Sequence, residues 1–495
     1  MQKQTLLYII SLLLLAACDN SIEITKDETH QMLEAEIAAD TSKHISFSPA
    51  ELAFISEIAN GTPKIDKDSA IKVALQAMGR GKQLSKSGVS VTAFGTPISG
   101  LTKSSKQSVI DTTLYVVNSH GGGFAVVSAD VRIPEQVLAY SEIGNLLLDS
   151  DNPVFAIFLD YAKDYAASCI AKAQEQRDSI ENSICEKLGI YQDTSENNSL
   201  TKAKRVVQRF LITSQCYTVT SVETVAEVKP LLKTNWHQNS PYNDSVGGSC
   251  INNSRYVAGC VAVATAQLIA YWRYPKSMNG IVFDWDKLNN EDSVDVSEYK
   301  TQAASLIHIV GKSIKTEYGC SHSPADACSS LHLLWYLGYK VPTVMSVYKY
   351  DGVINCLNKG WPVFMGGWRT KDRFLVFFNE YENGHQWLAD GYVHQKIITR
   401  NRLTYAVVEC DDEIGCGSCR YEHTYSAGSV TEPKYLHINW GWQNANGYYC
   451  KDVFDVKERY LLGSDGQYYP NSNNIKEDRN YRYALEYAKD LHYQN

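Results

Sequence analysis

The sequence contains no long run of Lys and Arg, no apolar stretch that comfortably spans a bilayer, and no internal repeat of the solenoid type. Its 47 basic and 55 acidic residues leave a net charge of -8 over 495 residues, so a basic surface for binding nucleic acid is not expected. A hydrophobic content of 44% with 21% charged residues is typical of a globular chain with two or three domains.

The N-terminus has the pattern of an export signal. Lys3 precedes a short apolar stretch that ends in small residues, which predicts a signal peptide over residues 1–17. The letters LAAC at residues 15–18 resemble a bacterial lipobox, in which Cys18 is lipidated and becomes the first residue of the mature protein. The alternative is an ordinary signal peptide with a coincidental Cys. We expect an exported lipoprotein, periplasmic or at the cell surface, or a protein secreted after processing.

The region after the signal divides into four parts by composition. Residues 18–45 carry Cys18 and a polar, acidic tether, and residues 46–205 form a compact α+β domain. Residues 206–227 belong to a polar stretch, beginning near residue 190, that suits an exposed linker cut during processing. Residues 228–495, rich in Trp, Tyr, Gly and Cys, form the candidate catalytic domain.

The first domain has recognisable local elements. DKDSAIKVALQAMG places apolar residues at helical spacing, with Asp68 or Ser69 able to cap the start. LYVVN and GFAVVSAD flank SHGGG, whose glycines permit the positive φ values of a tight β-hairpin. The following VFAIFLDYAKDYAASCIAKAQEQRDS predicts a second helix.

Cys260 is the candidate nucleophile. In AGCVAVATAQLIAYWRYP a turn-like Ala-Gly precedes a helical apolar run that stops at Pro275, so Cys260 is expected at a helix N-terminus. The free amides and positive dipole end there favour the thiolate and lower the sulfur's pKa. The alternative is a small buried core cysteine.

Two downstream segments supply partners for this sulfur. His385 lies in NGHQWLADGY and Asn439 in YLHINWGWQNANGYY, both strand-like. The order Cys, His 125 residues later and Asn 54 residues after that is typical of papain-type proteases. His437 shares a strand face with Asn439 and is a rival to His385.

The motifs GCVAVATAQ, GH before DGY, and HINWGW with NGYY resemble the streptopain family of cysteine proteases. The similarity extends to LLKTNWHQNSPYN, to WPVFMGGW and to GGGFAVVSAD, which resembles that family's inhibitory propeptide. The resemblance implies an α+β fold in which a propeptide domain precedes a papain-like protease domain. The expected partners are protein or peptide substrates and the chain's own propeptide, without a metal or an organic cofactor.

The same resemblance assigns roles at the site. Cys260 attacks a peptide carbonyl, His385 accepts its proton and later donates it to the leaving amine, and Asn439 orients the imidazole. The Cys260 amide and Gln238 are the candidate oxyanion donors, although Gln238 also fits a surface position. Trp440 is expected to line the cleft or, alternatively, to belong to the core.

Substrate contacts are also assigned to the two neighbours of His385, which are Gly384 and Gln386. Gln386 departs from the family pattern, where a small Ala is usual, and Gln443 stands where Gly is usual after WGW. A larger residue beside the base narrows the cleft, so specificity is less transferable than chemistry.

An insertion between Ile398 and Glu432 adds ECDDEIGCGSCRYEH, with Cys410, Cys416, Cys419 and His423. These four residues fit a zinc knuckle, but the exported context favours disulfides. The chain has thirteen cysteines, and eleven remain beside Cys18 and Cys260, so at least one more is free or pairs between chains.

Two rival functions use the same residues. One is another Cys-His acyl transferase, such as a transglutaminase or a cell-wall amidase, although these commonly place an acid behind the His. The other is a lipoprotein with a protease fold that binds proteins or peptides without turnover.

Overall fold

The computed structural model describes residues 44–79, 88–97, 110–146, 153–188, 206–251, 254–290, 297–370, 381–411, 415–442, 444–455, 461–462, 468–469 and 483–494. Cys18, the signal segment and Gln443 therefore lie outside the described residues. The chain divides into two compact units, and the smaller one comprises Met1–Lys64, Ala173–Glu223 and Gln395–Pro433. Within the described ranges, no helix is long and apolar enough to cross a bilayer.

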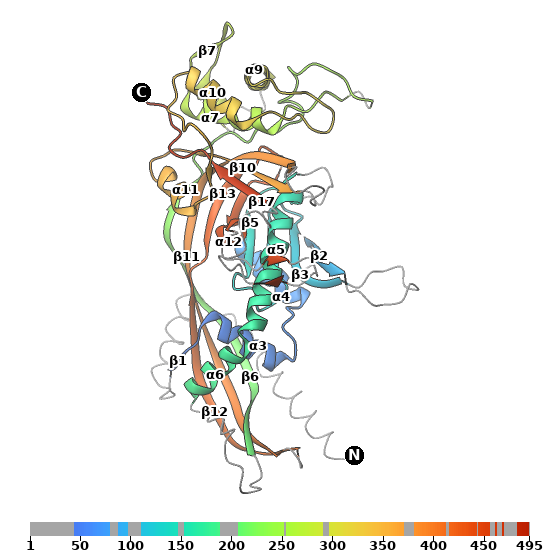
Figure 1. Ribbon diagram of the computed structural model, residues 1–495, viewed down its shortest axis with the longest axis vertical. Helices are drawn as coiled ribbons and strands as arrows, with labels where there is room; N and C mark the ends of the chain where they lie inside the picture. The colour runs from blue at the N-terminus through green and yellow to red at the C-terminus, as the bar shows by residue number, and fades with distance from the viewer. Residues whose placement is uncertain are drawn as a thin grey trace. The chain divides into compact units, whose positions relative to one another are not determined.

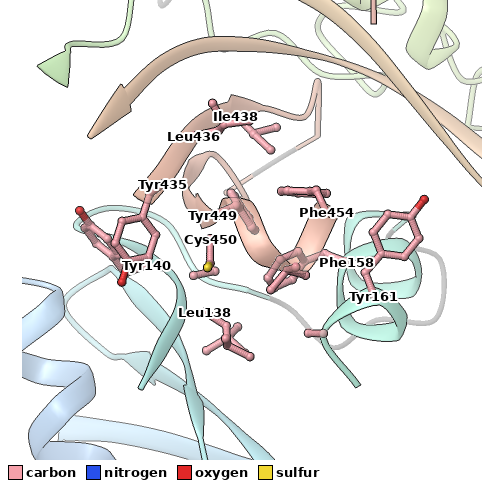
Figure 2. Packing of buried hydrophobic residues seen from close by; sticks show 14 of the residues in the cluster. Leu138, Tyr140, Phe158, Tyr161, Tyr435, Leu436, Ile438, Tyr449, Cys450 and Phe454 are labelled. Carbon is pink, nitrogen blue, oxygen red and sulfur yellow. The ribbon is translucent and has the colours of Figure 1, made fainter. Parts of the chain in front are cut away.

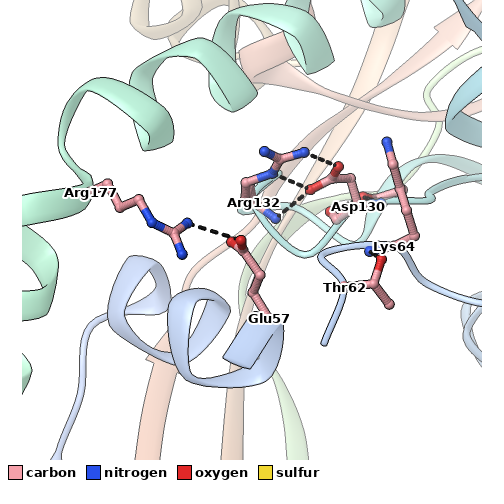
Figure 3. Close-up of polar contacts among 7 residues, drawn as sticks. Glu57, Thr62, Lys64, Asp130, Arg132 and Arg177 are labelled. Atoms are coloured by element: carbon pink, nitrogen blue, oxygen red, sulfur yellow. Dashed lines mark hydrogen bonds and ion pairs between the residues drawn. The ribbon is translucent and has the colours of Figure 1, made fainter. Parts of the chain in front are cut away.

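The smaller unit packs two helices on each other. Helix α3 (Pro49–Asn60) begins after Ser48, whose hydroxyl accepts a bond from the Glu51 amide while the Glu51 carboxylate accepts one from the Ser48 amide. Helix α6 (Arg177–Leu188) contributes to the same small core. Figure 3 shows the ion pair that joins Glu57 of α3 to Arg177 at 2.9 Å.

A long antiparallel hairpin completes this unit. Strand β11 (Tyr381–Asp411) pairs through its second half with β12 (Gly415–Thr431), and β1 (His44–Ser46) adds to β12 in parallel (Figure 1). The Cys-rich insertion is thus a β-hairpin, in which Cys410 and Cys416 are register partners. Their side chains, with those of Cys419 and His423, lie outside what the structure describes, so disulfides there stay a prediction.

The larger unit contains an extended sheet. Its strand order is β2-β3-β4-β5-β14-β13-β11-β10-β17-β9. The bounds are β2 (Val89–Pro97), β3 (Ile110–Ser119), β4 (Phe124–Ser128), β5 (Val137–Ser141), β9 (Ser346–Val347), β10 (Val363–Thr370), β13 (Lys434–Asn439), β14 (Gly447–Cys450) and β17 (Tyr483–Tyr487). The hairpin predicted from SHGGG is confirmed as β3 and β4, with Gly122 and Gly123 at φ values of 85° and 97°.

Two predicted helices lie in the N-terminal part of this unit. Helix α4 (Lys67–Ala77) packs on β4 and β5, and α5 (Pro153–Glu175) is the long second helix (Figure 1). The cap of α4 is not Asp68 or Ser69 as predicted. Asp66 caps the helix, because its carboxylate accepts a 2.9 Å bond from the Ser69 amide. A second carboxylate in this region, Asp130, binds the guanidinium of Arg132 (Figure 3).

The N-terminal strands and the C-terminal strands form one sheet, because β5 pairs with β14. Tyr140 and Tyr448 are register partners, and their rings stack at 5.2 Å. Phe158 of α5 packs edge-on against Tyr449 at 4.7 Å (Figure 2). The two regions that composition separates therefore share one hydrophobic core.

A second core lies on the other side of β10 and β11. It gathers helices α7 (Cys260–Trp272), α9 (Ser297–Ser313) and α10 (Ala327–Tyr336) around Phe364 and Leu388 of the sheet. The arrangement of helices with a mixed sheet confirms the α+β class.

The segment predicted as a linker has regular structure. Residues 206–227 lie in strand β6 (Val206–Val228), which pairs with β11. The prediction gave weight to the polar residues, but VVQRFLITSQCYTVTSVETVAEV is rich in Val, Thr, Ile, Phe and Tyr, which favour strands. The preceding residues 189–205 lie outside the described part of the chain.

A half-buried carboxyl group lies between the N-terminal and C-terminal parts of the larger unit. Burial raises the pKa of Glu135, the nearby charge of Asp452 raises it further, and a hydrogen bond from Tyr165 and the charge of Lys451 oppose the shift. Lys451 and Asp452 open the short helix α12 (Lys451–Phe454), and Tyr165 lies on α5. A raised pKa means that the folded chain holds the proton more tightly than the unfolded chain does.

Glu135 therefore favours folding at low pH, and this contribution is lost as pH rises from the ordinary carboxyl range through the raised pKa. Glu135→Gln keeps an acceptor for Tyr165 without the charge. We expect the variant to exceed the wild type in melting temperature by about 2 °C at pH 8 and to match it near about pH 4. Calorimetry at the two pH values tests this, and an offset independent of pH would contradict it.

Candidate active site

Cys260 is the first residue of α7, as the sequence predicted. Gly259 precedes it with a φ of 88°, and a Cβ atom there would lie 2.7 Å from the carbonyl oxygen of Ser323. Glycine at 259 is therefore required both by the backbone conformation and by the close approach of the neighbouring loop. The Cys260 side chain is half-buried and packs against the core around α7.

The backbone just before Cys260 is held from several directions. The Val257 amide donates to Gly319, and the Val257 carbonyl accepts a 2.7 Å bond from the Ser323 hydroxyl. A disulfide between Cys250 and Cys320 joins the two segments that make these contacts. The sequence made disulfides plausible without revealing their connectivity, and this one fixes the loop that leads to the nucleophile.

The pKa of Cys260 differs from the prediction. Burial raises the pKa by more than the backbone N–H groups of Gln386, Val261 and Cys260 lower it. Those of Val261 and Cys260 belong to the helix N-terminus, as expected, whereas that of Gln386 comes from β11. The net shift is upward, so the thiol is the favoured form in this state of the chain. The prediction counted the helix dipole, which sequence reveals, without the burial, which it does not.

His385 lies on β11 and is buried. Its Nε2 is 2.7 Å from the carbonyl oxygen of Trp440, and because a carbonyl only accepts, Nε2 carries the hydrogen and Nδ1 keeps the lone pair. Burial lowers the pKa of His385 to about 4, although the Trp440 carbonyl acts in the opposite direction. The ring is thus a neutral imidazole with Nδ1 as its basic atom.

Cys260 and His385 are not hydrogen-bonded to each other in the described structure. The His385 ring stacks on Trp387 and Trp440 at about 6 Å. Alternate residues of a strand share a face, so His385 lies on the Trp387 side of β11, where the Trp440 carbonyl holds its ring. The Cys260 sulfur faces the backbone N–H of Gln386, the next residue of the strand, so the nucleophile lies beside β11 without a hydrogen bond to the base.

Asn439 is the last residue of β13, and the hydrogen bonds of its side chain go to groups other than the imidazole. Its Nδ2 donates to the Thr234 carbonyl at 2.9 Å and lies 3.2 Å from Oε1 of Gln267. Its Oδ1 accepts from the Gly441 amide and from Gln267. The residue that binds the His385 ring is instead Trp440, through its backbone carbonyl.

The other candidate residues divide between the site and the core. The carbonyl of Gln238 accepts a 2.9 Å bond from the amide of Ala258. Ala258 is two residues before Cys260 in the sequence, so Gln238 is bonded to the loop that leads to the nucleophile. Gly384 is exposed. Trp440 is fully buried and packs on Trp387 with ring centroids 4.8 Å apart, as in the core alternative.

Gln386 is buried next to β10. A Cβ atom at Gly366 would lie 2.1 Å from Nε2 of Gln386, so Gly366 provides the space that this larger side chain occupies. The rival base, His437, binds Oδ1 of Asp390 through Nδ1 at 2.6 Å. Its ring is thereby committed to a carboxylate away from Cys260.

The sequence reasoning missed Gln267 and Asp390. Gln267 lies seven residues after Cys260 in a helix that is apolar at most positions, and Asp390 is a buried acid that accepts a bond from the Leu232 amide. A long polar side chain in such a run was the available signal for Gln267. Among the described residues, no group of three or more His, Cys, Asp or Glu is placed to hold a metal ion.

A model of the peptidase C10 family matches residues 236–449, which include Cys260, His385 and Asn439. Residues 236–449 therefore form a domain of the peptidase C10 family, the streptopain family, and this domain is a cysteine-type peptidase. A second family model, described as the Spi protease inhibitor, matches residues 62–166. The C10 domain is thus preceded by an inhibitor-type propeptide domain.

Two solved structures are similar to this chain. A fragment of prointerpain A from Prevotella intermedia is 18% identical in sequence, with a TM-score of 0.42. The match covers 82% of this chain and 100% of the fragment. Active interpain A cysteine protease from the same organism is 19% identical with a TM-score of 0.32, and covers 54% of this chain and 95% of its own. No curated protein matches.

The raised pKa of Cys260 predicts slow alkylation in the full-length chain. We expect the pH midpoint for iodoacetamide modification of Cys260, followed by mass spectrometry of its peptide, to lie above about 8.5, the value of an ordinary thiol. The same cysteine in urea is the matched control. A midpoint near neutral pH would show that the thiolate is already stabilised.

The buried imidazole predicts an acid-shifted titration. In full-length Cys260→Ala protein with labelled histidines, the His385 signal, identified by its loss in His385→Gln, is expected to titrate near pH 4. A lowered pKa stabilises the fold above the ordinary histidine range and loses that contribution as pH falls from about 6.5 toward 4. A signal titrating near 6.5 would contradict the burial of the ring.

Proposed function

We propose that the protein is an endopeptidase zymogen whose propeptide domain keeps Cys260 and His385 apart until it is removed. The observation that supports this is that the His385 ring is bonded to the Trp440 carbonyl and, among the described residues, not to Cys260, in a chain whose propeptide strand β5 is paired with protease strand β14. A thiol with a raised pKa and a neutral, buried imidazole are both poorly suited to catalysis in this state.

Activation then requires the His385 ring to reach the sulfur. Loss of the propeptide domain removes Phe158 and Tyr161 from the core that also contains Trp387 and Trp440. His385 lies at the edge of that core, and the change frees it to bring Nδ1 within hydrogen-bond distance of Cys260. The Trp440 carbonyl is suited to hold Nε2–H throughout, which keeps the tautomer that a general base needs.

The proposed chemistry is acyl transfer in two steps. Cys260 Sγ attacks the peptide carbonyl carbon as its proton passes to His385 Nδ1, and the oxyanion is stabilised by the Cys260 amide and by Gln238. Collapse of this intermediate breaks the C–N bond, the imidazolium protonates the leaving amine, and a thioester remains. Water, deprotonated by His385, then hydrolyses the thioester and restores the thiol.

Processing and export are the remaining parts of the proposal. Cleavage within about residues 200–227, by the enzyme itself or by another protease, separates the propeptide from the C10 domain. The 15–18 sequence LAAC supports export as a lipoprotein with Cys18 as the lipidated residue, in the periplasm or at the cell surface. Gly384, Gln386 and Trp440 are the candidate substrate-binding residues of the activated form.

A second function fits the separated pair of side chains. A chain in which Cys260 and His385 never meet would bind peptides without turnover. The two functions differ in whether trimming creates activity.

The experiment compares wild type, Cys260→Ala and His385→Ala, each without the signal segment and in reductant, for casein hydrolysis and for precursor size over time. We expect both variants to lose at least about 1,000-fold in kcat, since each removes a member of the catalytic pair. Activity should appear in the wild type only as the precursor is trimmed. Equal activity before and after trimming would contradict the zymogen, and inactivity after limited trypsin treatment would favour the binding protein.

A further inference from the structure

Two buried amide side chains, which the proposed chemistry does not use, bind each other behind the candidate site. Gln267 is 0% exposed and Asn439 is 3% exposed. The distance from Gln267 Nε2 to Asn439 Oδ1 and the distance from Asn439 Nδ2 to Gln267 Oε1 are both 3.2 Å. The two planar amides thus lie side by side and form two reciprocal hydrogen bonds.

The remaining polar positions of this pair bind backbone groups. Gln267 Oε1 also accepts from the Trp236 amide at 3.1 Å, and Asn439 Nδ2 also donates to the Thr234 carbonyl at 2.9 Å. Asn439 Oδ1 accepts in addition from the Gly441 amide at 3.1 Å. A buried amide without a hydrogen-bond partner costs free energy. The loss of either side chain therefore leaves the other amide and several backbone groups with unsatisfied hydrogen bonds.

The pair connects the three parts of the chain that carry the nucleophile, the oxyanion donor and the base. Gln267 lies on α7, about 10 Å along the helix from Cys260. Thr234 and Trp236 belong to the 231–238 segment, which ends at Gln238, the candidate oxyanion donor.

The third part is the base. Asn439 and the Gly441 amide that it binds flank Trp440, whose carbonyl holds the His385 ring. One pair of side chains therefore bonds to the Gly441 amide, directly after that carbonyl, and to the segment that carries Gln238, from a fixed point on α7.

We propose that Asn439 and Gln267 act together as positioning residues, which set the 231–238 segment, and with it Gln238, relative to Cys260. This inference rests on the proposed function and deepens it. It replaces direct orientation of His385 by Asn439 with an indirect role, because the imidazole is already held by the Trp440 carbonyl.

The segment has a second anchor that is consistent with this role. Asp390 accepts bonds from the Leu231 and Leu232 amides, through its carbonyl at 2.8 Å and its carboxylate at 3.1 Å. The Gln238 carbonyl accepts from Ala258 at the far end. The amide pair thus acts on the middle of a segment held at both ends, so its loss is expected to loosen residues 234–236, which lead to Gln238, without detaching the chain.

The test is a double-mutant cycle on the trimmed enzyme with Asn439→Ala, Gln267→Ala and the double variant. Each single variant is expected to lower kcat about 10- to 100-fold with little change in KM, and the double variant to be no worse than either alone. Asn439→Ala combined with Gln238→Ala should likewise be non-additive. Additive losses in either combination would overturn the proposal.

Alkylation of Cys260 separates this role from orientation of the imidazole. Iodoacetamide needs a thiolate but no oxyanion donor, so its rate and pH profile in the trimmed form are expected to stay as in the wild type for both single variants. A shifted profile in Asn439→Ala but not in Gln267→Ala would show that Asn439 acts on His385, and would overturn the proposal. Thr265→Val is the matched control, because Thr265 is a buried polar residue on α7 whose hydroxyl bonds to the Val261 carbonyl and to the Ser330 hydroxyl, away from the amide pair.

Amide hydrogen exchange tests the side-chain pairing without any measurement of enzyme activity. The Trp236 and Gly441 amides are expected to exchange at least about tenfold faster in both single variants than in the wild type or Thr265→Val. If the wild type cleaves no peptide, the proposed function fails while this result still decides the pairing. Unchanged exchange at both amides would overturn the pairing itself.

Discussion

The pairing of β5 with β14 is the interaction on which the rest of the described structure depends. It joins the strands of the propeptide domain to those of the C10 domain, and it brings Tyr140 onto Tyr448 and α5 onto the ring of Tyr449. A strand bond of this kind is satisfied by the backbone, whatever the side chains are. The aromatic side chains around this strand pair then bury apolar area, so the junction of the two domains is part of a hydrophobic core.

The electrostatics of the candidate pair follow from burial in two places, because His385 stacks on Trp387 and Trp440 of that shared core whereas Cys260 packs against the second core around α7. Both Cys260 and His385 are shifted toward their neutral forms by burial, and only weakly in the other direction by the amides and the carbonyl that they face. With both groups neutral and no hydrogen bond between them in the described structure, the pair lacks the thiolate and the imidazolium that would compensate each other's charge.

Much of the local structure could be predicted from the sequence, because it depends on neighbouring residues. The start of α7 at Cys260 follows from the glycine before it and the apolar run after it, and the β3–β4 hairpin follows from its glycines. The regular structure of strand β6 was missed, because polar residues between its β-branched ones concealed the strand propensity, whereas its role as the processing segment stays a prediction.

The relation between distant parts was not predictable in the same way. Asn439 and Gln267 are 172 residues apart, and nothing in either local sequence specifies the other. The same holds for the side of β11 from which His385 projects, since strand periodicity assigns residues to alternate faces without saying what covers each face. Residue type therefore indicated the chemistry of the site, whereas its assembly depends on the tertiary fold.

The place of β14 in the sheet also affects how the trimmed enzyme associates with other chains in solution. While β5 is bound, β14 is an interior strand with partners on both sides. Once the propeptide domain leaves, one side of β14 becomes a sheet edge, with unpaired amides and carbonyls beside the rings of Tyr448 and Tyr449. Maturation thus replaces an intramolecular neighbour with a surface on which another extended chain can pair, and the colloidal behaviour of the protease is linked to the fate of its propeptide.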